Sequence, residues 1–384
     1  MSNTYILPER IDTASYTSFE NEVESFIAQN DAQSLTLDAE KLTYISSAGL
    51  RVLLKLRKAQ EINIINVCPQ VYEVFQTTGF DTLINIKKAM RSISVEGCEI
   101  IGSGITGTVY RLDSDTIAKV YDRKVPLSSI ERERELARTA FLNGVPTAIS
   151  YDVVKCGDTY GIVFELINAD TFASCFHNRP DTFDHYAGLY ADTLLRLHSA
   201  HDEEKVLPEI KVKYHNWIEG MRVYFNDEEI QQLHRLVDSV PDTDTIIHGD
   251  FHPKNIMIQN GEPLLIDMSD VSRGNPVFDL AGIGMTHRYY AVTAAEKSVR
   301  FLGVDAEEVM RLWYYILSRY FNTHNKDVIM QKEEMLMPYV LLRYVLQPAV
   351  FPLLDDDEKL ESVKAAREKL LPYIDEIIEK GLNL

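Results

Sequence analysis

The chain has 384 residues, of which 45% are apolar and 25% are charged, so it can bury a large core and form two or three domains. Its formal net charge of -19 argues against indiscriminate binding to nucleic acid or anionic lipid, which needs a basic surface. A cationic substrate, such as an amino sugar or a choline-like amine, stays open, although such a charge usually serves solubility alone.

The N-terminal sequence MSNTYILPERID lacks the basic start and apolar stretch of a secretory signal. The longest apolar region begins at Tyr339, is interrupted by Arg343, Gln347 and two prolines, and is too short to span a bilayer. The four cysteines are far apart, with no CxxC pair, so reduced thiols are expected. We therefore expect a cytoplasmic protein without a membrane segment.

From residue 5 to about residue 86, short β-rich runs alternate with helical ones. Strands are expected at residues 35–39 and 62–67. A helix is expected where Leu50, Leu53 and Leu54 recur at helical spacing, and another after Pro69, a residue that a first helical turn tolerates. The pattern predicts a small α/β sandwich formed by residues 1–92.

The pattern changes near residue 93 to a series of short strands, interrupted by a charged helix that ends near Gly144 and Pro146. From Asp184 onward, helical patterns dominate. We expect residues 93–384 to form a two-lobed enzyme, with a β-rich N-lobe at about 93–167 and a helical C-lobe at about 168–384.

The segment GSGITGTVY contains a GxGxxG pattern, made by Gly102, Gly104 and Gly107. In a dinucleotide-binding fold these glycines would open a helix, but here the following residues continue into a second strand. A hairpin that covers phosphates fits better, since glycines let backbone N–H groups approach phosphates, with Ser103 and Thr106 as further donors. A plain hairpin turn is the alternative.

Lys119 interrupts an apolar strand, DTIAKVY, where a cation can reach the α- and β-phosphates of a nucleotide. An isolated lysine on a strand otherwise faces solvent. The charged helix that follows offers Glu131, Glu133 and Glu135 as ion-pair partners that could orient this lysine. Motif alignment favours Glu133.

The most specific motif is IIHGDFHPKNIMIQNGEPLLIDMSD at residues 246–270. Asp250 is suited to position an attacking hydroxyl and accept its proton, while Asn255 and Asp267 supply the oxygen ligands that Mg²⁺ prefers. The two candidate ligands are separated by a hairpin turned at Asn260 and Gly261.

The same segment contains two histidines, His248 and His252. We expect both to hold backbone carbonyls in place, and the alternatives are zinc binding or general-base catalysis.

HGDFHPKN, followed by LLID and GNPVFDLA, resembles the aminoglycoside phosphotransferase and choline kinase superfamily, relatives of the protein kinases, from about Glu99 to Leu280. The resemblance implies an ATP- and Mg²⁺-dependent phosphotransferase with an alcohol group as acceptor. It makes Asp250 the catalytic aspartate and Asn255 and Asp267 the magnesium ligands.

The resemblance also implies that Lys119 and Glu133 form the ion pair of the N-lobe. Residues 164–167 take the place of the hinge, where the backbone of Glu165 and Ile167 would bind adenine. The segment LLRLHSAH, with His198, resembles a helix motif of that group.

Two further positions refine this reading. Gly249 stands where protein kinases have arginine, and no APE-like motif follows Asp267, so small-molecule acceptors are favoured over proteins. Asp279, in VFDLAG, is expected at a helix start, where it would brace the catalytic loop.

LTLDAEKLTYISSAGLRVLL and VCPQVYEVFQTTGF resemble a STAS domain, the fold of anti-sigma factor antagonists, over most of residues 3–90. In those antagonists a phosphorylatable serine opens a helix after an aspartate. Ser47 takes the place of that serine, and Ser46 stands where the aspartate usually is. A phosphate on Ser47 would lie at a helix N-terminus, which favours anions. The alternative is that Ser47 is an ordinary N-cap.

We therefore expect a STAS-like domain, with a regulatory or docking role toward a protein partner, fused to a kinase of small-molecule hydroxyl groups. The alternatives are a signalling kinase that phosphorylates Ser47 or a partner, and a non-catalytic nucleotide sensor. Neither nucleic acid nor membrane is expected as a partner.

Overall fold

The computed structural model describes residues 3–30, 34–104, 106–167, 169–178, 182–302, 305–351 and 354–383. The chain divides into two compact units. The first unit contains residues 1–94 and 154–157, and the second contains residues 95–153 and 158–384.

The first unit is built on a four-stranded parallel sheet. Its strands follow the order β1 (Thr4–Ile6), β3 (Ser34–Asp38), β5 (Glu61–Val67) and β6 (Asn85–Lys88). A short parallel pair joins β2 (Arg10–Ile11) and β4 (Tyr44–Ile45). The helices are α1 (Tyr16–Asn30), α2 (Ser47–Ala59), α3 (Pro69–Thr77) and α4 (Phe80–Leu83).

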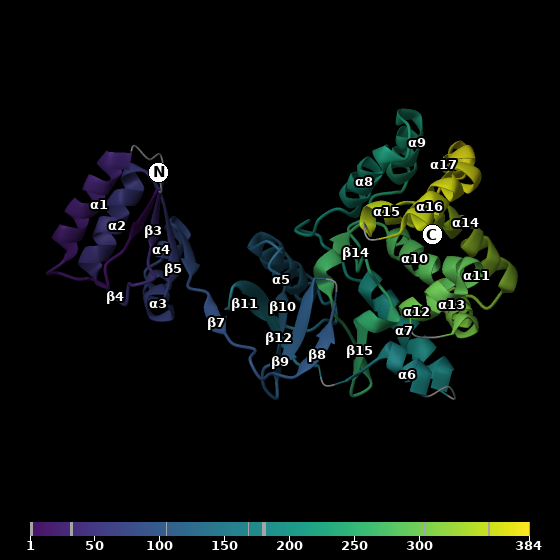
Figure 1. Ribbon diagram of the computed structural model, residues 1–384, viewed down its shortest axis with the longest axis horizontal. Coiled ribbons are helices and arrows are strands. Elements are labelled where there is room, and N and C mark those ends of the chain that lie inside the picture. Colours follow the sequence, from purple (N-terminus) through teal and green to yellow (C-terminus); the bar gives the residue numbers. More distant parts are fainter. Residues whose placement is uncertain are drawn as a thin grey trace. The chain divides into compact units, whose positions relative to one another are not determined.

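Apolar side chains at the expected spacings form the core of this unit. In β3, Leu35 and Leu37 are fully buried, while the residues between and beside them are partly exposed. In α2, Leu50 and Leu53 lie on the buried face, and α1 lies beside this helix (Figure 1). The predicted small α/β fold is confirmed.

The first turn of α2 corrects one expectation. The N-cap is Ser46, whose backbone is extended (φ -94°, ψ 174°), and Ser47 is the first helical residue. The reading of Ser47 as the N-cap is therefore wrong. Ser47 is exposed, whereas the Ser46 hydroxyl is buried and has no hydrogen-bond partner in the part of the chain that the structure describes.

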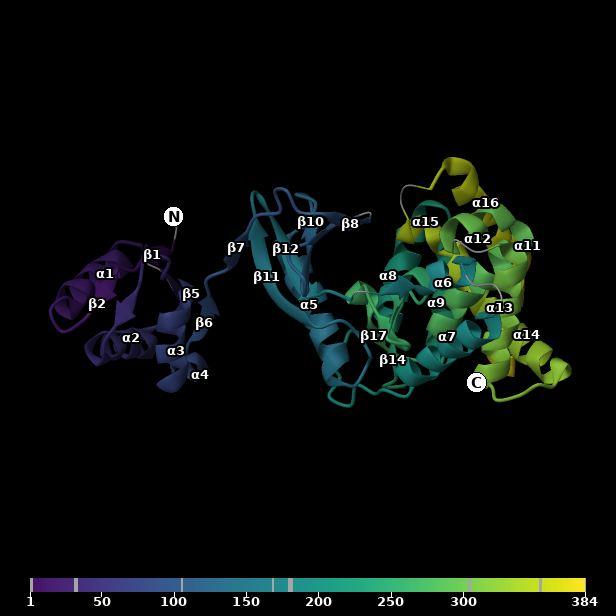
Figure 2. The same ribbon diagram turned by 90° about the horizontal axis from the view of Figure 1, so that it is seen from below.

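The N-terminal sheet of the second unit is mainly antiparallel. Its neighbouring strands are β11 (Ser150–Cys156), β12 (Thr159–Glu165), β10 (Thr116–Tyr121), β9 (Gly107–Arg111) and β8 (Ile100–Ser103). The end of β11, which groups with the first unit, pairs in parallel with β7 (Arg91–Ile93). Helix α5 (Leu127–Leu142) packs along β12 (Figure 2).

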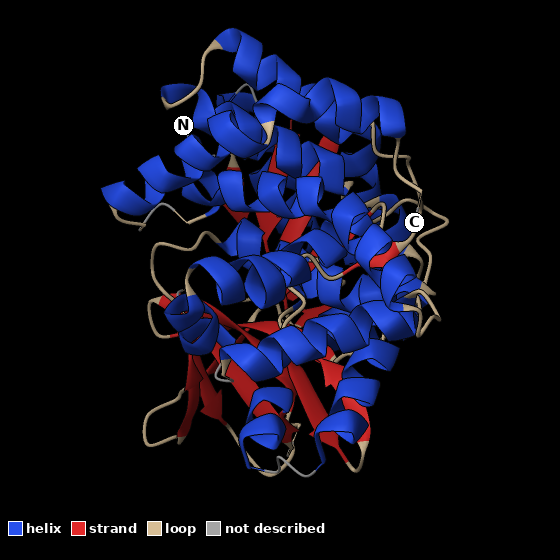
Figure 3. Cartoon of the chain, turned by 90° about the vertical axis from the view of Figure 1, so that its right-hand side faces the viewer, coloured by secondary structure: helices blue, strands red, loops and turns tan. Residues whose placement is uncertain are grey.

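The remainder of the second unit is predominantly helical, as Figure 3 shows in blue. Its α-helices are α6 (Phe172–Asn178), α7 (Phe183–His198), α8 (Ile210–Gly220), α9 (Asp227–Asp238), α10 (Val277–Gly284), α11 (Tyr290–Thr293), α12 (Ala295–Leu302), α13 (Ala306–Tyr320), α14 (Lys326–Val345), α15 (Gln347–Val350), α16 (Asp356–Lys369) and α17 (Ile374–Lys380). Single helical turns are η2 (Met221–Val223), η3 (Pro253–Asn255), η4 (Met268–Asp270), η5 (Met285–Tyr289) and η6 (Leu371–Tyr373). The strands are β13 (Asp170–Thr171), β14 (Ile246–Ile247), β15 (Ile256–Gln259), β16 (Glu262–Leu265) and β17 (Ser272–Arg273).

A β-rich part followed by a helical part is the predicted architecture, so the fold class is confirmed. The apolar region from Tyr339 belongs to the C-terminal half of α14 and to α15, where Arg343 and Gln347 are buried. Within the described ranges, no helix is long and apolar enough to cross a membrane.

Candidate active site

The loop between β14 and β15 carries the predicted catalytic residues. Within it, the side-chain amide of Asn255 donates to the Asp250 backbone oxygen at 3.1 Å and to its carboxylate Oδ2 at 3.2 Å. Asn255 is buried, and η3 begins with Pro253, which fits a first helical turn. Because the amide N–H groups of Asn255 are used within the loop, its amide oxygen is left to coordinate a cation.

The Asp250 carboxylate is half-exposed and lies 3.4 Å from Nε2 of His252. His252 Nδ1 accepts from the Lys254 N–H, so the ring proton lies on Nε2 and points to Asp250. Burial acts to raise the pKa of Asp250, but the hydrogen bond from His252 and the charges of His252, His248 and Arg343 outweigh it and lower the pKa to about 2. A carboxylate contact is therefore present at His252, and the predicted carbonyl contact stays a prediction.

Asp279 fixes the start of the loop from the first turn of α10. Its two carboxylate oxygens accept the backbone N–H groups of His248 and Gly249, each at 2.7 Å. His248 Nε2 lies 3.1 Å from the Ile266 carbonyl oxygen. The bracing role predicted for Asp279 and the carbonyl contact predicted for His248 are both confirmed.

Gly249 can only be glycine in this backbone. Its φ is +80°, and a Cβ atom built there would lie 2.6 Å from the backbone oxygen of Asp270. The arginine of protein kinases therefore has no space here.

A buried histidine extends the brace into the helical core. His198 ends α7, and its Nε2 lies 3.2 Å from Asp279 Oδ2 while its Nδ1 lies 2.8 Å from the Tyr320 hydroxyl. Burial acts to raise the pKa of Asp279. The hydrogen bond from His198, the charges of His198 and His248, and the backbone hydrogen bond from His248 outweigh burial and lower this pKa. The sequence pattern indicated His198, but nothing in it indicated Tyr320.

Lys119 connects the sheet to the residues after β16. Its Nζ lies 2.8 Å from Glu133 Oε1 and 3.1 Å from Asp267 Oδ1. Burial would lower the pKa of Lys119, but the charges of Asp267 and Glu133 raise it, so the ammonium stays charged. The ion pair predicted between Lys119 and Glu133 is present.

Asp267 and Asn255 are brought together by the β15–β16 hairpin. The N–H of Ile266, which precedes Asp267, donates to the Asn255 carbonyl at 2.9 Å. The backbone of Asp267 is in the left-handed region (φ 59°), and its carboxylate is 43% exposed. Its Oδ1 faces Lys119, and its other oxygen is available to a metal ion. In the described part of the chain, no three His, Cys, Asp or Glu side chains form a metal-binding group. A carboxylate, an amide and nucleotide oxygens together are a donor set that suits Mg²⁺.

The GxGxxG segment forms a hairpin, because β8 and β9 pair antiparallel on either side of it. The Gly104 N–H donates to the Gly107 carbonyl at 2.9 Å, and a Cβ on Gly107 would collide with the Val120 carbonyl. Gly104, Ser103 and Thr106 are exposed around the turn, whereas Ile105 lies outside the described residues. The hairpin prediction is confirmed, and the helix that a dinucleotide fold requires does not follow.

The predicted hinge lies where β12 ends. The Glu165 N–H donates to the Ile149 carbonyl at 3.0 Å, and the next N–H, of Leu166, donates to the Asp115 carbonyl at 2.8 Å. No hydrogen bond between described residues uses the N–H of Ile167. That donor is available to an adenine ring, and the binding roles of Glu165 and Ile167 stay predictions.

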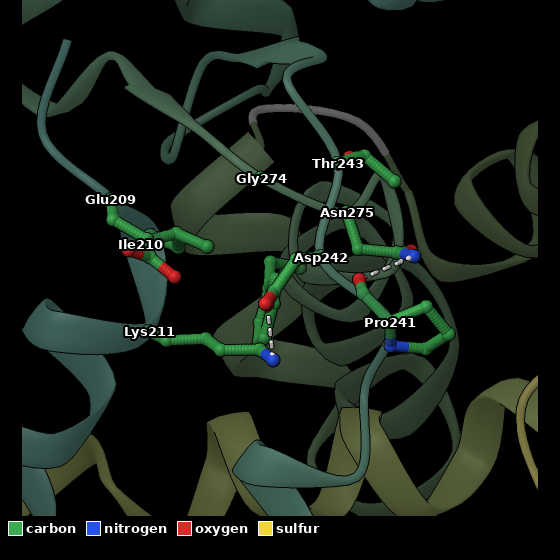
Figure 4. A pocket seen from close by; sticks show the side chains of 9 residues that line it. Glu209, Ile210, Lys211, Pro241, Asp242, Thr243, Gly274 and Asn275 are labelled. Atoms are coloured by element: carbon green, nitrogen blue, oxygen red, sulfur yellow. Dashed lines mark hydrogen bonds and ion pairs between the residues drawn. The ribbon is translucent and has the colours of Figure 1, made fainter. Parts of the chain in front are cut away.

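Figure 4 shows a hollow in the second unit that is lined by residues 209–211, 241–243, 274, 275 and 278. It surrounds Gly274 and is narrowed by the Lys211–Asp242 ion pair at 2.5 Å and by the hydrogen bond from Asn275 to the Pro241 carbonyl at 3.2 Å. None of the predicted site residues lines it, and we assign it no role.

Family models match both halves of the chain. Residues 97–313 match the model described as phosphotransferase enzyme family, and residues 4–93 match the STAS domain. A search of curated proteins found no match.

Solved structures that resemble the chain include three kinases. One is the aminoglycoside phosphotransferase APH(2'')-Ib with ADP bound, at 16% identity and a TM-score of 0.48, covering 72% of this chain and 93% of that one. A choline/ethanolamine kinase family protein from Mesorhizobium loti has 14% identity and a TM-score of 0.47, with 74% and 92% covered. The amicoumacin kinase hAmiN, in complex with AMP-PNP, Ca²⁺ and Ami, has 15% identity and a TM-score of 0.45, with 79% and 93% covered.

Proposed function

The chain belongs to the phosphotransferase enzyme family, and from that premise we propose that it transfers the γ-phosphoryl group of ATP to a hydroxyl group of a small molecule. The observation that carries this proposal is the position of Lys119, between Glu133 and Asp267, beside a loop that holds Asp250 and Asn255 together. Phosphoryl transfer needs such an arrangement, because it depends on positioning and on stabilisation of charge.

In this proposal each group has a separate task. The glycine hairpin, with Gly102, Gly104 and Gly107, covers the phosphates, and Lys119 neutralises charge on them. Asn255 and Asp267 would hold Mg²⁺, which supplies further neutralisation of charge on the transferred phosphoryl group. Asp250 orients the acceptor hydroxyl and takes its proton, and its low pKa keeps it ionised at neutral pH.

The same residues argue against a non-catalytic nucleotide sensor. A sensor needs a nucleotide site but does not need a carboxylate for an acceptor hydroxyl, and Asp279 fixes the loop that carries such a carboxylate, Asp250. The absence of an APE-like motif from the sequence favours a small acceptor over a protein.

We further propose that residues 1–92 act as a STAS-like docking or regulatory module and that residues 93–384 form the kinase, with lobes at about 93–167 and 168–384. The family matches, to residues 4–93 and 97–313, support this division. A protein partner of the STAS domain is part of the proposal.

Replacing Asp267 tests the metal and nucleotide assignment. We expect Asp267→Ala to weaken Mg²⁺-ATP binding by about 10- to 100-fold, because the variant loses a charged metal ligand that also pairs with Lys119. Isothermal titration calorimetry with Mg²⁺ and a non-hydrolysable ATP analogue measures the effect. The matched control is Asp158→Ala, since Asp158 is 77% exposed and pairs with the surface residue Arg123. Equal affinity in wild type and Asp267→Ala would place the metal elsewhere.

A second candidate function is phosphorylation of the STAS domain itself, and one observation favours it. Ser47 is exposed at the first position of α2, where helix N–H groups favour a phosphate. We expect incubation with Mg²⁺-ATP to add phosphate at position 47 in wild type and in a Ser47→Thr variant. No phosphate should be added there in Ser47→Ala. Peptide mapping by mass spectrometry detects it, with Asp250→Asn as the control for transfer by this chain. An unmodified Ser47 under conditions of ATP turnover would reject this function.

A further inference from the structure

Helix α14 buries a guanidinium group, that of Arg343, which makes no hydrogen bond or ion pair within the described part of the chain. Arg343 is only 7% exposed, and its Nη1 atom has no hydrogen-bond partner among the described residues. Its other side-chain nitrogens also make no hydrogen bond or ion pair within that part of the chain. A buried guanidinium N–H group without an acceptor is unfavourable. This cost indicates that Arg343 serves a group outside the chain.

The surroundings of Arg343 hold a second cation and an aromatic ring. The Arg343 guanidinium carbon lies 4.9 Å from the centre of the Trp217 ring, and Lys213 Nζ lies 5.5 Å from the same centre. Trp217 and Lys213 are one turn apart on α8. Lys213 forms an ion pair with Asp270, whereas Arg343 makes no ion pair within the described residues.

These residues adjoin the candidate catalytic loop. The backbone oxygen of Asp270 packs directly against Gly249, the residue before Asp250. The charge of Arg343 is among those that lower the pKa of Asp250, as expected for a cation near this carboxylate. None of the residues assigned to the nucleotide comes from α8 or α14, so Trp217, Lys213 and Arg343 form a separate group.

We propose that Arg343 determines acceptor specificity, and that the acceptor carries a carboxylate or phosphate group in addition to the hydroxyl that receives the phosphoryl group. This inference rests on the proposed function and names its substrate class. A guanidinium binds either anion through two parallel hydrogen bonds, and the Trp217 ring limits the directions in which Arg343 can turn. A cationic acceptor group at Arg343 would face a like charge, so the amino sugar or choline-like amine allowed by the net charge is disfavoured.

Two sets of compounds that differ mainly in charge test the proposal. The three-carbon set is glycerol, D-glycerate, glycerol 3-phosphate and 3-amino-1,2-propanediol, and the six-carbon set is glucose, gluconate, glucose 6-phosphate and glucosamine. Each is offered to the full chain with Mg²⁺-ATP, and mass spectrometry identifies the phosphorylated product. We expect the highest kcat/KM for an anionic member, and the carboxylate and phosphate members distinguish the two anions. A cationic member with the highest kcat/KM would overturn the proposal.

The variants separate recognition from folding. Arg343→Met should lower kcat/KM for the anionic acceptor by about 10- to 100-fold, mainly through KM, and Arg343→Lys should restore part of it. The kcat/KM for the neutral member of each set should change little. The matched control is Arg319→Met, which removes an exposed arginine paired with Asp192. Arg343→Met should keep or raise the melting temperature, because it removes a buried N–H group that has no acceptor among the described residues. A lower melting temperature with unchanged kcat/KM would show a structural role instead.

Calorimetry makes this test independent of turnover. The same anions are titrated into wild type and Arg343→Met, each saturated with Mg²⁺ and a non-hydrolysable ATP analogue that blocks the nucleotide site. Anion binding that Arg343→Met abolishes would support the subsite, and if no compound were phosphorylated it would locate the failure in the proposed transfer reaction. If wild type bound none of the anions, or if the variant bound them equally well, the subsite would be overturned.

Discussion

Asp250→Asn is expected to lower kcat for phosphoryl transfer by about 10²- to 10⁴-fold, the usual contribution of a positioned acid or base. The substitution keeps the shape of the side chain but removes the charge that would orient and deprotonate the acceptor hydroxyl. Affinity for Mg²⁺-ATP should stay within about threefold of wild type, because the proposed metal ligands are retained. Single-turnover transfer measures the first effect and calorimetry the second.

The control for Asp250 is Asp242→Asn, which changes a carboxylate that is 75% exposed and pairs with Lys211. Its kcat should equal that of wild type. The pH profile gives a separate check, since a pKa of about 2 leaves Asp250 ionised throughout the working range. Wild type should therefore show no loss of activity from protonation of Asp250 above about pH 4. Undiminished transfer by Asp250→Asn would remove this residue from the chemistry.

Local features of the site could be predicted because each depends on a few neighbouring residues. The β15–β16 hairpin turns at Asn260 and Gly261, with φ values of 53° and 86°, and Asn-Gly is the dipeptide that tolerates such a turn. The glycine hairpin is equally local, since Gly107 must leave space for the neighbouring strand. Lys119 and Glu133 are only 14 residues apart, on a strand and the helix that follows it.

Other features depend on residues that meet only after the helices have packed. His198 and Tyr320 are 122 positions apart, and neither residue type indicates the contact. Arg343 looked like an interruption of an apolar region, and only the fold shows that it is buried and that its Nη1 has no hydrogen-bond partner among the described residues. The alternative that Ser47 is the N-cap of α2 was wrong for a different reason. Ser46 and Ser47 have the same side chain, so backbone geometry alone decides which residue is the cap.

Asp279→Ala is expected to lower the free energy of unfolding of the second unit by about 3–5 kcal/mol, the usual cost of removing one partner of a buried charged pair. The variant leaves the N–H groups of His248 and Gly249 without an acceptor, and His198 without its carboxylate. Urea denaturation followed by tryptophan fluorescence measures the loss, because both tryptophans of the chain, Trp217 and Trp313, lie in the second unit. The control Asp375→Ala removes an exposed ion pair with Arg235 and should cost less than about 1 kcal/mol.

The pH dependence of stability distinguishes this brace from simple packing. Because the folded state lowers the pKa of Asp279, the carboxylate stabilises the fold above its unfolded pKa, near 4, and loses this contribution as pH falls through the folded value. Asp279→Asn is close in shape but uncharged, and its NH₂ group would face one of the backbone donors that the carboxylate accepts. The difference in unfolding free energy between wild type and Asp279→Asn should therefore be largest at neutral pH and shrink in acid. A difference that stayed constant between pH 7 and the acid limit of folding would show that the charge of Asp279 does not hold the loop.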